Sequence, residues 1–165
     1  MELMISEDEG TSRIFSSLRS LSGLSVEIGL PEGASPRSRF LLALHEHGAP
    51  GANIPPRRVL GPALADARTR GEIEAGLLQA CEAAARGDEN GVTTGFEQAG
   101  QAGANGIRAY IDAGVSPPNS PVTVHGGWIR RKGMRAGYPV PGKGFDKPLV
   151  DTGELYRSFT YRIIP

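Results

Sequence analysis

The sequence predicts an α+β fold in which a small antiparallel or mixed sheet packs against two main helices, with long Pro/Gly-rich loops. Three observations lead to this prediction. Apolar residues recur at helical spacing over residues 64–84 and again over 92–111. Two short segments, near residues 24–30 and at the C-terminus, alternate apolar and polar residues as strands do. The 165 residues include 23 Gly and 13 Pro, which indicates one domain, residues 1–165, with a small core and long connections.

The N-terminal part of the chain predicts a helix followed by a strand. Residues 11–22 carry an apolar helical face that Gly23 can end, formed by Ile14, Phe15, Leu18 and Leu21. Residues 24–30, Leu-Ser-Val-Glu-Ile-Gly-Leu, alternate as a strand. Residues 38–47 fit either a buried strand or a short helix, and periodicity alone does not decide between them.

Two long helices follow an irregular segment. Residues 48–61 contain three prolines that would interrupt any strand ladder. Pro62 suits the first position of a helix that Gly87 then ends. The second helix contains Gly95, Gly100, Gly103 and Gly106. Each glycine costs about 1 kcal/mol relative to alanine, so we expect a compensating close approach of another backbone. That backbone belongs either to the first long helix or to a neighbouring subunit.

The single domain divides into four segments. Residues 1–23 form a helical segment, residues 24–114 the sheet-and-helix core, residues 115–148 an extended loop arm, and residues 149–165 a capped turn with a closing strand. The six prolines of the arm predict irregular structure with short strands, such as 122–124, that partners order. The closing strand alternates Phe159, Tyr161 and Ile163 with polar residues.

Composition narrows the classes of function. The formal net charge is zero, which disfavours a protein that binds nucleic acid through a large basic excess. Cys81 is the sole cysteine, and we expect it to be a small core residue on the apolar face of the first long helix. No apolar run approaches the ~18 residues of a membrane span, and the N-terminus is acidic, so we expect a soluble protein made in the cytoplasm, with no membrane contact.

Residues 149–153, Leu-Val-Asp-Thr-Gly, match the pattern around the catalytic aspartate of aspartic proteases. Such an enzyme needs two carboxylates that share a proton, and a substantial β-fold after the motif. Only twelve residues follow Gly153, which disfavours a peptidase. Asp151 with Glu154 three residues later matches a capping box at the start of a short helical turn, which Leu155 would pack on the core. We therefore expect a structural motif formed by Asp151, Thr152, Gly153, Glu154 and Leu155.

Two other motifs fall short of a known chemistry. Residues 137–144 approach the spacing of a phosphate-binding loop, but Gly144 stands where the motif needs a hydroxyl, and two prolines remove backbone donors. His45 and His47 are two residues apart instead of the four of a metalloprotease helix. On a strand they would share a face and could form a weak metal site, although packing and capping roles are commoner. We expect no cofactor and no resident metal.

Residues 125–147 combine a local net charge of +5 with interleaved aromatic residues. The basic residues are Arg130, Arg131, Lys132, Arg135, Lys143 and Lys147, and the aromatic ones are Trp128, Tyr138 and Phe145. Such a loop can face DNA, dock onto an acidic protein surface, or be a solvated connection. Trp128 argues against the solvated connection, because exposed tryptophan is enriched at interfaces.

Three segments together resemble a known family. Residues 45–60 carry His-Glu-x-Gly followed by Ile-Pro-x-Arg, and residues 117–124 read Pro-Pro-Asn-Ser-Pro-Val-Thr-Val. The third and most specific segment, residues 142–163, includes Lys-Pro-Leu-Val-Asp-Thr-Gly-Glu-Leu-Tyr. In this order they resemble the tail-component or tail-completion proteins of long-tailed phages and prophages, related to the virion-morphogenesis proteins of Mu-like phages. The resemblance covers roughly residues 24–164.

The resemblance implies a small, non-enzymatic α+β subunit of the virion neck or tail, made in the cytoplasm of the host bacterium. It implies a homo-oligomeric ring of six copies between the head–tail connector or head-closure protein and the tail terminator or tail tube. The arm would then reach an adjacent ring or the genome DNA in the channel. The rival hypothesis is an accessory protein that binds nucleic acid through residues 125–147.

Two sets of residues follow from these motifs. The residues expected at assembly interfaces are Ile54, Pro55, Arg57, Trp128, Arg130, Arg131, Lys132, Lys143, Phe145 and Lys147. Those expected to shape the local structure are His45, Glu46 and Gly48, together with residues 151–155.

Overall fold

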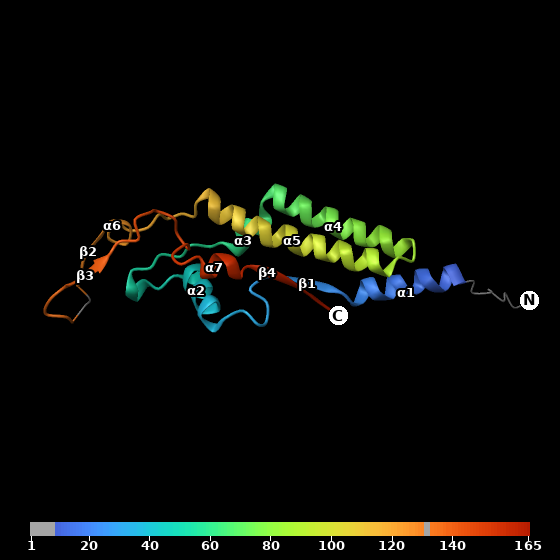
Figure 1. The fold of residues 1–165 in the computed structure, drawn as a ribbon, viewed down its shortest axis with the longest axis horizontal. Helices are drawn as coiled ribbons and strands as arrows, with labels where there is room; N and C mark the ends of the chain where they lie inside the picture. The colour runs from blue at the N-terminus through green and yellow to red at the C-terminus, as the bar shows by residue number, and fades with distance from the viewer. Residues whose placement is uncertain (1–8, 131–132) are drawn as a thin grey trace, which may run out of the picture.

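A computed structural model describes residues 9–130 and 133–165 and has the α+β fold that the sequence predicts. The elements are α1 (Glu9–Gly23), β1 (Ser25–Gly29), α2 (Pro36–His47), the 3-10 turn η1 (Pro50–Ala52), α3 (Leu60–Ala65), α4 (Ala67–Ala85), α5 (Glu89–Ala113), α6 (Pro121–His125), β2 (Gly126–Ile129), β3 (Tyr138–Pro141), α7 (Glu154–Ser158) and β4 (Thr160–Ile164). Figure 1 shows an elongated molecule with α1 at one end, the β2–β3 hairpin at the other, and α4 beside α5 between them.

The sheet is two separate antiparallel pairs, β1 with β4 and β2 with β3. The two predicted strands near the chain ends therefore pair with each other. Their register places Val26 opposite Ile163 and Ile28 opposite Tyr161. These four apolar side chains share one face of the pair, and that face lies against α5.

Glycine allows α4 and α5 to touch backbone to backbone. A Cβ atom at Gly95 would lie 2.6 Å from the carbonyl oxygen of Gly76 and equally close to the backbone nitrogen of Ala80. A Cβ atom at Gly76 would lie 2.7 Å from the nitrogen of Ala99. Of the two alternatives left open by the sequence, the first long helix therefore supplies the close approach at Gly95.

The other glycines of α5 accommodate side chains. Thr69 of α4 fills the space at Gly106, the Tyr161 ring lies over Gly100, and Ile28 lies over Gly103, where a Cβ atom would be 2.6 Å from its Cδ1. The sheet thus packs directly on the glycine face of α5. The sequence did not indicate this third source of compensation, because its two strands lie far from α5 in the chain.

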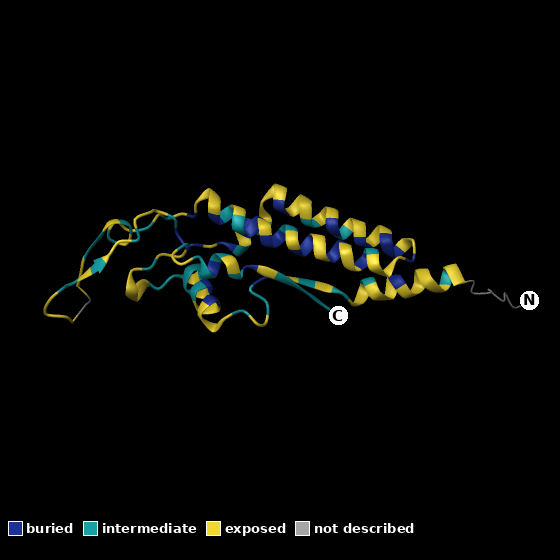
Figure 2. Cartoon of the chain, in the orientation of Figure 1, coloured by how far each residue is buried: buried dark blue, intermediate teal, exposed yellow. Residues whose placement is uncertain are grey.

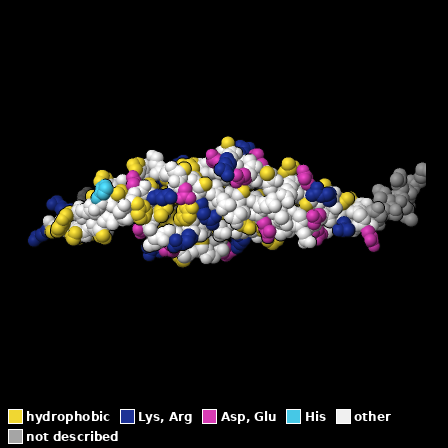
Figure 3. All heavy atoms as spheres, turned by 45° about the horizontal axis from the view of Figure 1, so that its top comes forward, with side chains coloured by type: hydrophobic (Ala, Val, Ile, Leu, Met, Phe, Trp, Pro, Cys, Tyr) yellow, Lys and Arg dark blue, Asp and Glu magenta, His cyan; other side chains and the backbone are white. Residues whose placement is uncertain are grey.

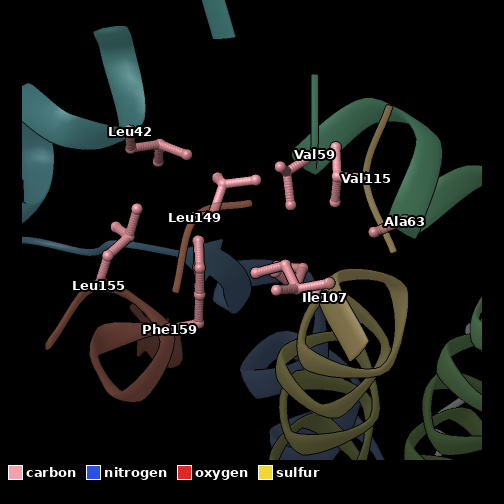
Figure 4. Packing of buried hydrophobic residues seen from close by; sticks show 9 residues of the cluster. Leu42, Val59, Ala63, Ile107, Val115, Leu149, Leu155 and Phe159 are labelled. Carbon is pink, nitrogen blue, oxygen red and sulfur yellow. The ribbon is translucent and has the colours of Figure 1, made fainter. Parts of the chain in front are cut away.

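Two clusters of buried apolar residues form the core (Figure 2). The larger lies where α5, α2, α7 and the segments around them meet, as Figure 4 shows, and comprises Leu42, Val59, Ala63, Ile107, Ile111, Val115, Leu149, Leu155 and Phe159. The smaller lies between α4 and α5 and comprises Ala80, Ala83, Ala84, Val92 and Phe96. The predicted packing of Leu155 on the core is confirmed.

The predicted helix from Pro62 to Ala84 is interrupted. α3 ends at Ala65, and the carboxylate of Asp66 accepts hydrogen bonds from the backbone of Arg68 and Thr69 at 3.1 and 3.0 Å, which starts α4. Pro62 is the third residue of α3, not its first. The predicted stop is confirmed, because Gly87 follows the cap residue Arg86 in the left-handed region, with φ 72°.

The prediction that Cys81 is a core residue is wrong, because Cys81 is exposed. The buried side of α4 consists of small residues, Gly76, Ala80, Ala83 and Ala84. The close crossing with α5 leaves no room for larger side chains, so the larger residues of α4 do not mark its buried face.

The N-terminal helix forms as predicted, but most of its apolar face does not pack on the body. Phe15 is 60% exposed, and Ile14 and Leu18 are exposed as well. The side that meets the α4–α5 turn carries the buried Ser17, and a Cβ atom at Gly87 would lie 3.3 Å from the Ile14 nitrogen. Only Leu21 of the predicted face joins a core cluster.

Two short segments are helical because a Ser-Pro pair starts each of them. Ser35 accepts the Ser38 N–H at 3.0 Å ahead of α2, which resolves the ambiguity of residues 38–47 in favour of a helix. Ser120 accepts the Thr123 N–H at 3.3 Å ahead of α6. The predicted strand at 122–124 is therefore wrong. In both cases the serine cap and the proline at the first helical position were the available signal.

Among the described residues, no helix combines the length and the hydropathy needed to cross a membrane.

The glycine crossing gives the first testable prediction. Gly95→Ala forces α4 and α5 apart, and we expect it to lower the free energy of unfolding by about 2 kcal/mol despite the better helix propensity of alanine. Gly71→Ala is the matched control, because nothing lies within 4 Å of a Cβ atom there. That variant should gain about 0.5–1 kcal/mol. Urea unfolding of the two variants measures the difference, and equal effects would contradict the close crossing.

Candidate assembly site at the arm and its root

A β-hairpin projects from the body at the end of the molecule opposite α1 (Figure 1). The sequence predicted a longer loop arm, residues 115–148. From here on, the arm means only residues 121–141, which hold α6, β2 and β3. The strands pair from Gly126 with Pro141 to Ile129 with Tyr138, and they pack on α6. Trp128 is 73% exposed on β2, in agreement with its expected place at an interface. Ile129 and Met134 are exposed beside it in the arm.

The described part of the arm carries two of the cations of segment 125–147. Arg130 and Arg135 are exposed, while Arg131 and Lys132 lie outside the described residues. Figure 3 shows Lys or Arg side chains together with hydrophobic ones at this end of the molecule. Lys143 and Lys147, the other two cations of that segment, belong to the root described next.

The Lys143 side chain binds main-chain groups of its own loop. Its Nζ donates hydrogen bonds to the carbonyl oxygens of Lys147 at 2.7 Å and Val150 at 2.6 Å, and it lies 4.8 Å from the centre of the Phe145 ring. Burial lowers the pKa of Lys143, while the charges of Asp151 and Asp146 oppose that shift. Lys143 is expected at an assembly interface, but its ammonium group is bonded within its own chain, and these hydrogen bonds close the loop that follows the arm. The Phe145 ring is exposed, as an interface residue would be.

The same loop is tied to the arm and to α5. The backbone N–H groups of Lys143 and Gly144 donate to Thr123 and Val124 of α6 at 3.0 and 2.9 Å. Lys147 Nζ donates to Asp112 Oδ1 at 2.6 Å, at the end of α5. Tyr156 of α7 donates to the other oxygen of Asp112 at 2.7 Å. These two hydrogen bonds lower the pKa of Asp112.

Sequence reasoning missed Asp112 as a structural residue. Its two partners lie 35 and 44 positions away in the chain, so no local pattern marks it.

Arg57 is buried, with only 7% of its surface exposed. Its guanidinium donates from Nε to the carbonyl oxygen of Pro117 at 2.7 Å and from Nη2 to that of Pro118 at 2.9 Å. Burial lowers the pKa of Arg57, and the charge of Asp146 opposes this shift. Arg57 therefore does not reach a neighbouring subunit from this position. It joins the segment after α2 to the segment that leads into the arm.

Asp146 completes that connection from the other side. Its Oδ1 accepts the backbone N–H of Asn119 at 3.0 Å. The segment before the arm is thus held by Arg57 on its carbonyl groups and by Asp146 on an N–H group.

The His-Glu-x-Gly motif shapes the end of α2. Glu46 Oε1 accepts the backbone N–H groups of Val59 and Leu60, both at 2.8 Å, and so caps the start of α3. Gly48 has a left-handed φ of 70°, and a Cβ atom there would lie 2.8 Å from the Ile54 carbonyl oxygen. The expected structural role of this motif agrees with these contacts.

His45 lies behind this cap. Its carbonyl oxygen accepts the Arg57 N–H at 2.6 Å, and its Nδ1 is buried without a hydrogen-bond partner. Burial, the charge of Arg57 and the charge of Lys143 all lower the pKa of His45. Within the described residues, no group of three or more His, Cys, Asp or Glu side chains could hold a metal ion.

Ile54 and Pro55 lie in the loop that follows. Ile54 exchanges backbone hydrogen bonds with Ala49 at 2.8 and 3.1 Å, which closes the loop, and its side chain is half-buried. Pro55 is exposed and remains available to a partner.

The prediction that Asp151 caps α7 is wrong. The cap residue is Gly153, in the left-handed region with φ 78°, and the Glu154 N–H donates to the hydroxyl of Thr152 at 3.3 Å. The turn that begins α7 depends on glycine geometry and on Thr152. The Asp151 carboxylate acts electrostatically on Lys143 instead.

Glu154 joins α7 to α2 and is not part of a capping box. Its Oε1 accepts a hydrogen bond from the Ser35 hydroxyl at 3.1 Å, and its Oε2 lies 3.5 Å from Arg37 Nε. Ser35 is also the cap of α2, so one serine serves both helices.

A cavity of about 490 Å³ lies between the arm and the body. Its apolar walls come from Ile129 and Val140 of the arm and from Leu41, Leu149 and Leu155 of the body, and its polar lining includes His45, Lys143 and Asp151.

All three segments that carry the family resemblance meet at one place. Arg57 bridges the first and second, Asp146 bridges the second and third, and Lys143 closes the third on itself. We call this contact region, formed by residues 45–60, 117–119 and 143–155, the root. Most of the predicted site residues build the root. Of the residues expected at assembly interfaces, the described ones that present exposed surface are Pro55, Trp128, Arg130 and Phe145.

Comparisons of the chain with protein-family models, with curated proteins and with solved structures returned no match.

The capping role of Glu46 gives a prediction for stability. Glu46→Ala leaves the backbone N–H groups of the buried Val59 and the half-buried Leu60 without this acceptor, which should lower the free energy of unfolding by about 1–3 kcal/mol. Glu82→Ala is the control, because Glu82 makes only an exposed pair with Arg86, worth about 0.3–0.5 kcal/mol. Urea titration of both variants provides the measurement, and indistinguishable midpoints would contradict the cap.

His45 predicts a pH dependence. Its pKa in the folded state lies below the value of about 6.5 in the unfolded chain, so the unfolded chain binds the proton more tightly. Stability is therefore complete above pH ~6.5 and falls as the pH drops toward the folded pKa. His45→Gln should remove this part of the loss between pH 6.5 and 5, as measured by thermal unfolding across the pH series. The His125→Gln variant, changed within the arm, is the control, and a wild-type slope in His45→Gln would contradict the assignment.

Proposed function

We propose that this chain is a non-enzymatic structural subunit of a phage virion, a tail-completion or neck component. In this proposal it forms a homo-oligomeric ring, of six copies by the family resemblance, between the head–tail connector or head-closure protein and the tail terminator or tail tube. The observation that carries the proposal is a projecting arm with an exposed tryptophan, held in place by the three segments on which the resemblance rests.

The exposure of Trp128 supports docking of the arm. Burying a tryptophan side chain removes on the order of 200 Å² from water. At about 25 cal/mol per Å², this favours association by about 5 kcal/mol before the costs of binding are subtracted. Ile129 and Met134 in the arm, and Phe145 just beyond it, add apolar surface nearby. A solvated connection gives no reason for this concentration of exposed apolar side chains.

The root supports the same function by limiting the entropic cost of docking. Arg57 and Lys143 donate hydrogen bonds to main-chain carbonyl groups, and Asp146 accepts one from a main-chain N–H group. These bonds fix the segments on both sides of the arm. A surface that is already ordered before binding loses less conformational freedom when it binds. This suits a subunit that must insert a projection into a neighbour.

The alternative is an accessory protein that binds nucleic acid through residues 125–147. The exposed Arg130 and Arg135 on the arm favour it. The internal hydrogen bonds of Lys143 and the ion pair of Lys147 with Asp112 weigh against it, because they remove two cations from the surface that would meet phosphate.

Substitution of Trp128 tests the docking role. Trp128→Ala should leave the thermal midpoint nearly unchanged, because the side chain is exposed, and should abolish incorporation of the chain into particles. Phe40→Ala is the control, since Phe40 is an equally exposed aromatic residue on α2, outside the arm. Particles that incorporate Trp128→Ala as well as the wild-type chain would contradict the proposal.

Salt-dependent binding separates the alternative. A nucleic-acid binder should lose affinity for duplex DNA with a slope of about −0.9 per phosphate contacted when log affinity is plotted against log salt. Neutralising Arg130, Arg131 and Lys132 should then abolish binding. For a structural subunit we expect weak binding that these substitutions change little, measured by fluorescence anisotropy from 50 to 200 mM salt.

A further inference from the structure

The β1–β4 pair has two unpaired edges. Each strand is bonded to the other along its length, and in the described part of the chain no further backbone hydrogen bond joins either strand to another segment. Each strand therefore directs a row of N–H and C=O groups outward. Such edges are templates for another strand unless the protein protects them.

The apolar face of this pair is too narrow to be buried fully. Val26, Ile28, Tyr161 and Ile163 all point toward α5, yet each remains only half-buried. Two strands alone form a marginal sheet, and three or more with a covered face form a stable one. An added strand on either side would cover these side chains further.

The hairpin of the arm shows what a protected edge looks like. β3 contains Pro139 and Pro141, opposite Trp128 and Gly126. Because proline has no N–H group, it is confined to edges that do not pair further. β1 and β4 contain no proline, so their edges lack the protection that the prolines give β3.

The charged side chains of β1 and β4 determine which strand edges can pair between two copies. Glu27 on β1 lies opposite Arg162 on β4, with 3.2 Å between the carboxylate and the guanidinium, and Arg162 also reaches Glu32 at 2.8 Å. Pairing β1 with the β1 strand of a second copy would bring two glutamates together, and pairing β4 with β4 would bring two arginines together. Like charges on adjacent strands are destabilising. Pairing β4 with the β1 strand of a second copy places Arg162 between two glutamates.

We propose that a second copy of this chain adds its β1 strand, antiparallel, to the β4 edge of the first, so that the strand order β1-β4 repeats from copy to copy. This inference rests on the proposed function for its view of the chain as a ring subunit. The contact joins unlike edges, so each added copy leaves a new free β4 edge, and such heterologous contacts form a ring when the rotation from copy to copy closes. The right-handed twist of a sheet turns each copy relative to the last.

The shape of the molecule accommodates this stacking. In Figure 1, viewed along the shortest axis, the two strands run along the long axis with α5 and then α4 above them. The strands run along the long axis, and α5 covers one face of the pair. The strand edges therefore point along the third direction, which is the shortest dimension of the molecule. Copies joined at these edges therefore stack through their thinnest dimension.

Crosslinking of mixed chains tests the pairing. In a Cys81→Ser background, one chain carries a single cysteine at Ser25 or Glu27, and a second chain carries one at Thr160, Arg162 or Ile164. Each pair is mixed and oxidised. A disulfide between the two chains can then form only across copies, so the intrachain pairing of β1 with β4 does not contribute. We expect crosslinked heterodimers in at least one mixture, and Arg70→Cys on the exposed side of α4 serves as the collision control.

The same single-cysteine chains, oxidised alone, report the other arrangements. Crosslinks of Glu27→Cys chains with each other, or of Arg162→Cys chains with each other, in place of the mixed product would overturn the proposal in favour of like-edge pairing. Chains that enter particles, or form oligomers by light scattering, without any mixed crosslink would overturn the strand pairing and leave the proposed function standing. Mixed crosslinks in a chain that never enters particles would support the pairing and overturn the proposed function.

Discussion

The buried guanidinium of Arg57 is the interaction on which the arrangement of this protein depends. It lies among main-chain carbonyl groups, with no carboxylate within the distance of an ion pair among the described residues. A buried cation is costly unless hydrogen bonds replace its water, and two charge-assisted bonds to Pro117 and Pro118 do so here. Because those carbonyl groups precede the arm directly, the same bonds determine where the arm leaves the body. Glu46, which holds the start of α3, keeps the segment that carries Arg57 in place.

The rest of the molecule supplies a narrow body for that arm. Glycine contacts bring α4, α5 and the β1–β4 pair into close layers, and much of the α4–α5 core consists of alanine. Such packing buries little side-chain volume per residue. Specific polar contacts therefore contribute more to the placement of the helices and strands than they would in a protein with a larger apolar core. The isolated chain leaves the apolar face of α1, the edges of β1 and β4, and Trp128 of the arm exposed. Each of these suits a chain that functions among neighbours.

Local chemistry explains which parts of the fold could be predicted from the sequence. The two long helices, the two strands near the chain ends and the stop at Gly87 follow from periodicity and from single residues with strong backbone preferences. Predictions failed where distant contacts decide. Cys81 follows the apolar pattern of α4, but the glycine crossing turns the small residues inward. The cap prediction failed for a local reason, because Gly153 adopts the left-handed conformation and caps α7 two residues after Asp151.

The candidate site shows the same limit. The motifs were recognisable one by one, but Arg57 and Lys143 were expected to face partners, whereas both bind carbonyl groups. The acceptors of Arg57 lie 60 and 61 positions away, so no pattern within its segment indicates them, whereas those of Lys143 lie four and seven residues on in the same loop. The exposure of Trp128 agrees with its expected place at an interface, an expectation that rested on the enrichment of exposed tryptophan at interfaces.

We infer that the root holds the arm in one orientation, ready for docking. Pulsed electron–electron double resonance measures the distance between nitroxide labels at Trp128→Cys in the arm and Leu78→Cys on α4, in a Cys81→Ser background, and so tests the orientation of the arm directly. We expect one narrow distribution of distances, which broadens when Arg57→Met removes the bonds to Pro117 and Pro118. A broad distribution with Arg57 present, or a narrow one that Arg57→Met leaves unchanged, would contradict the claim.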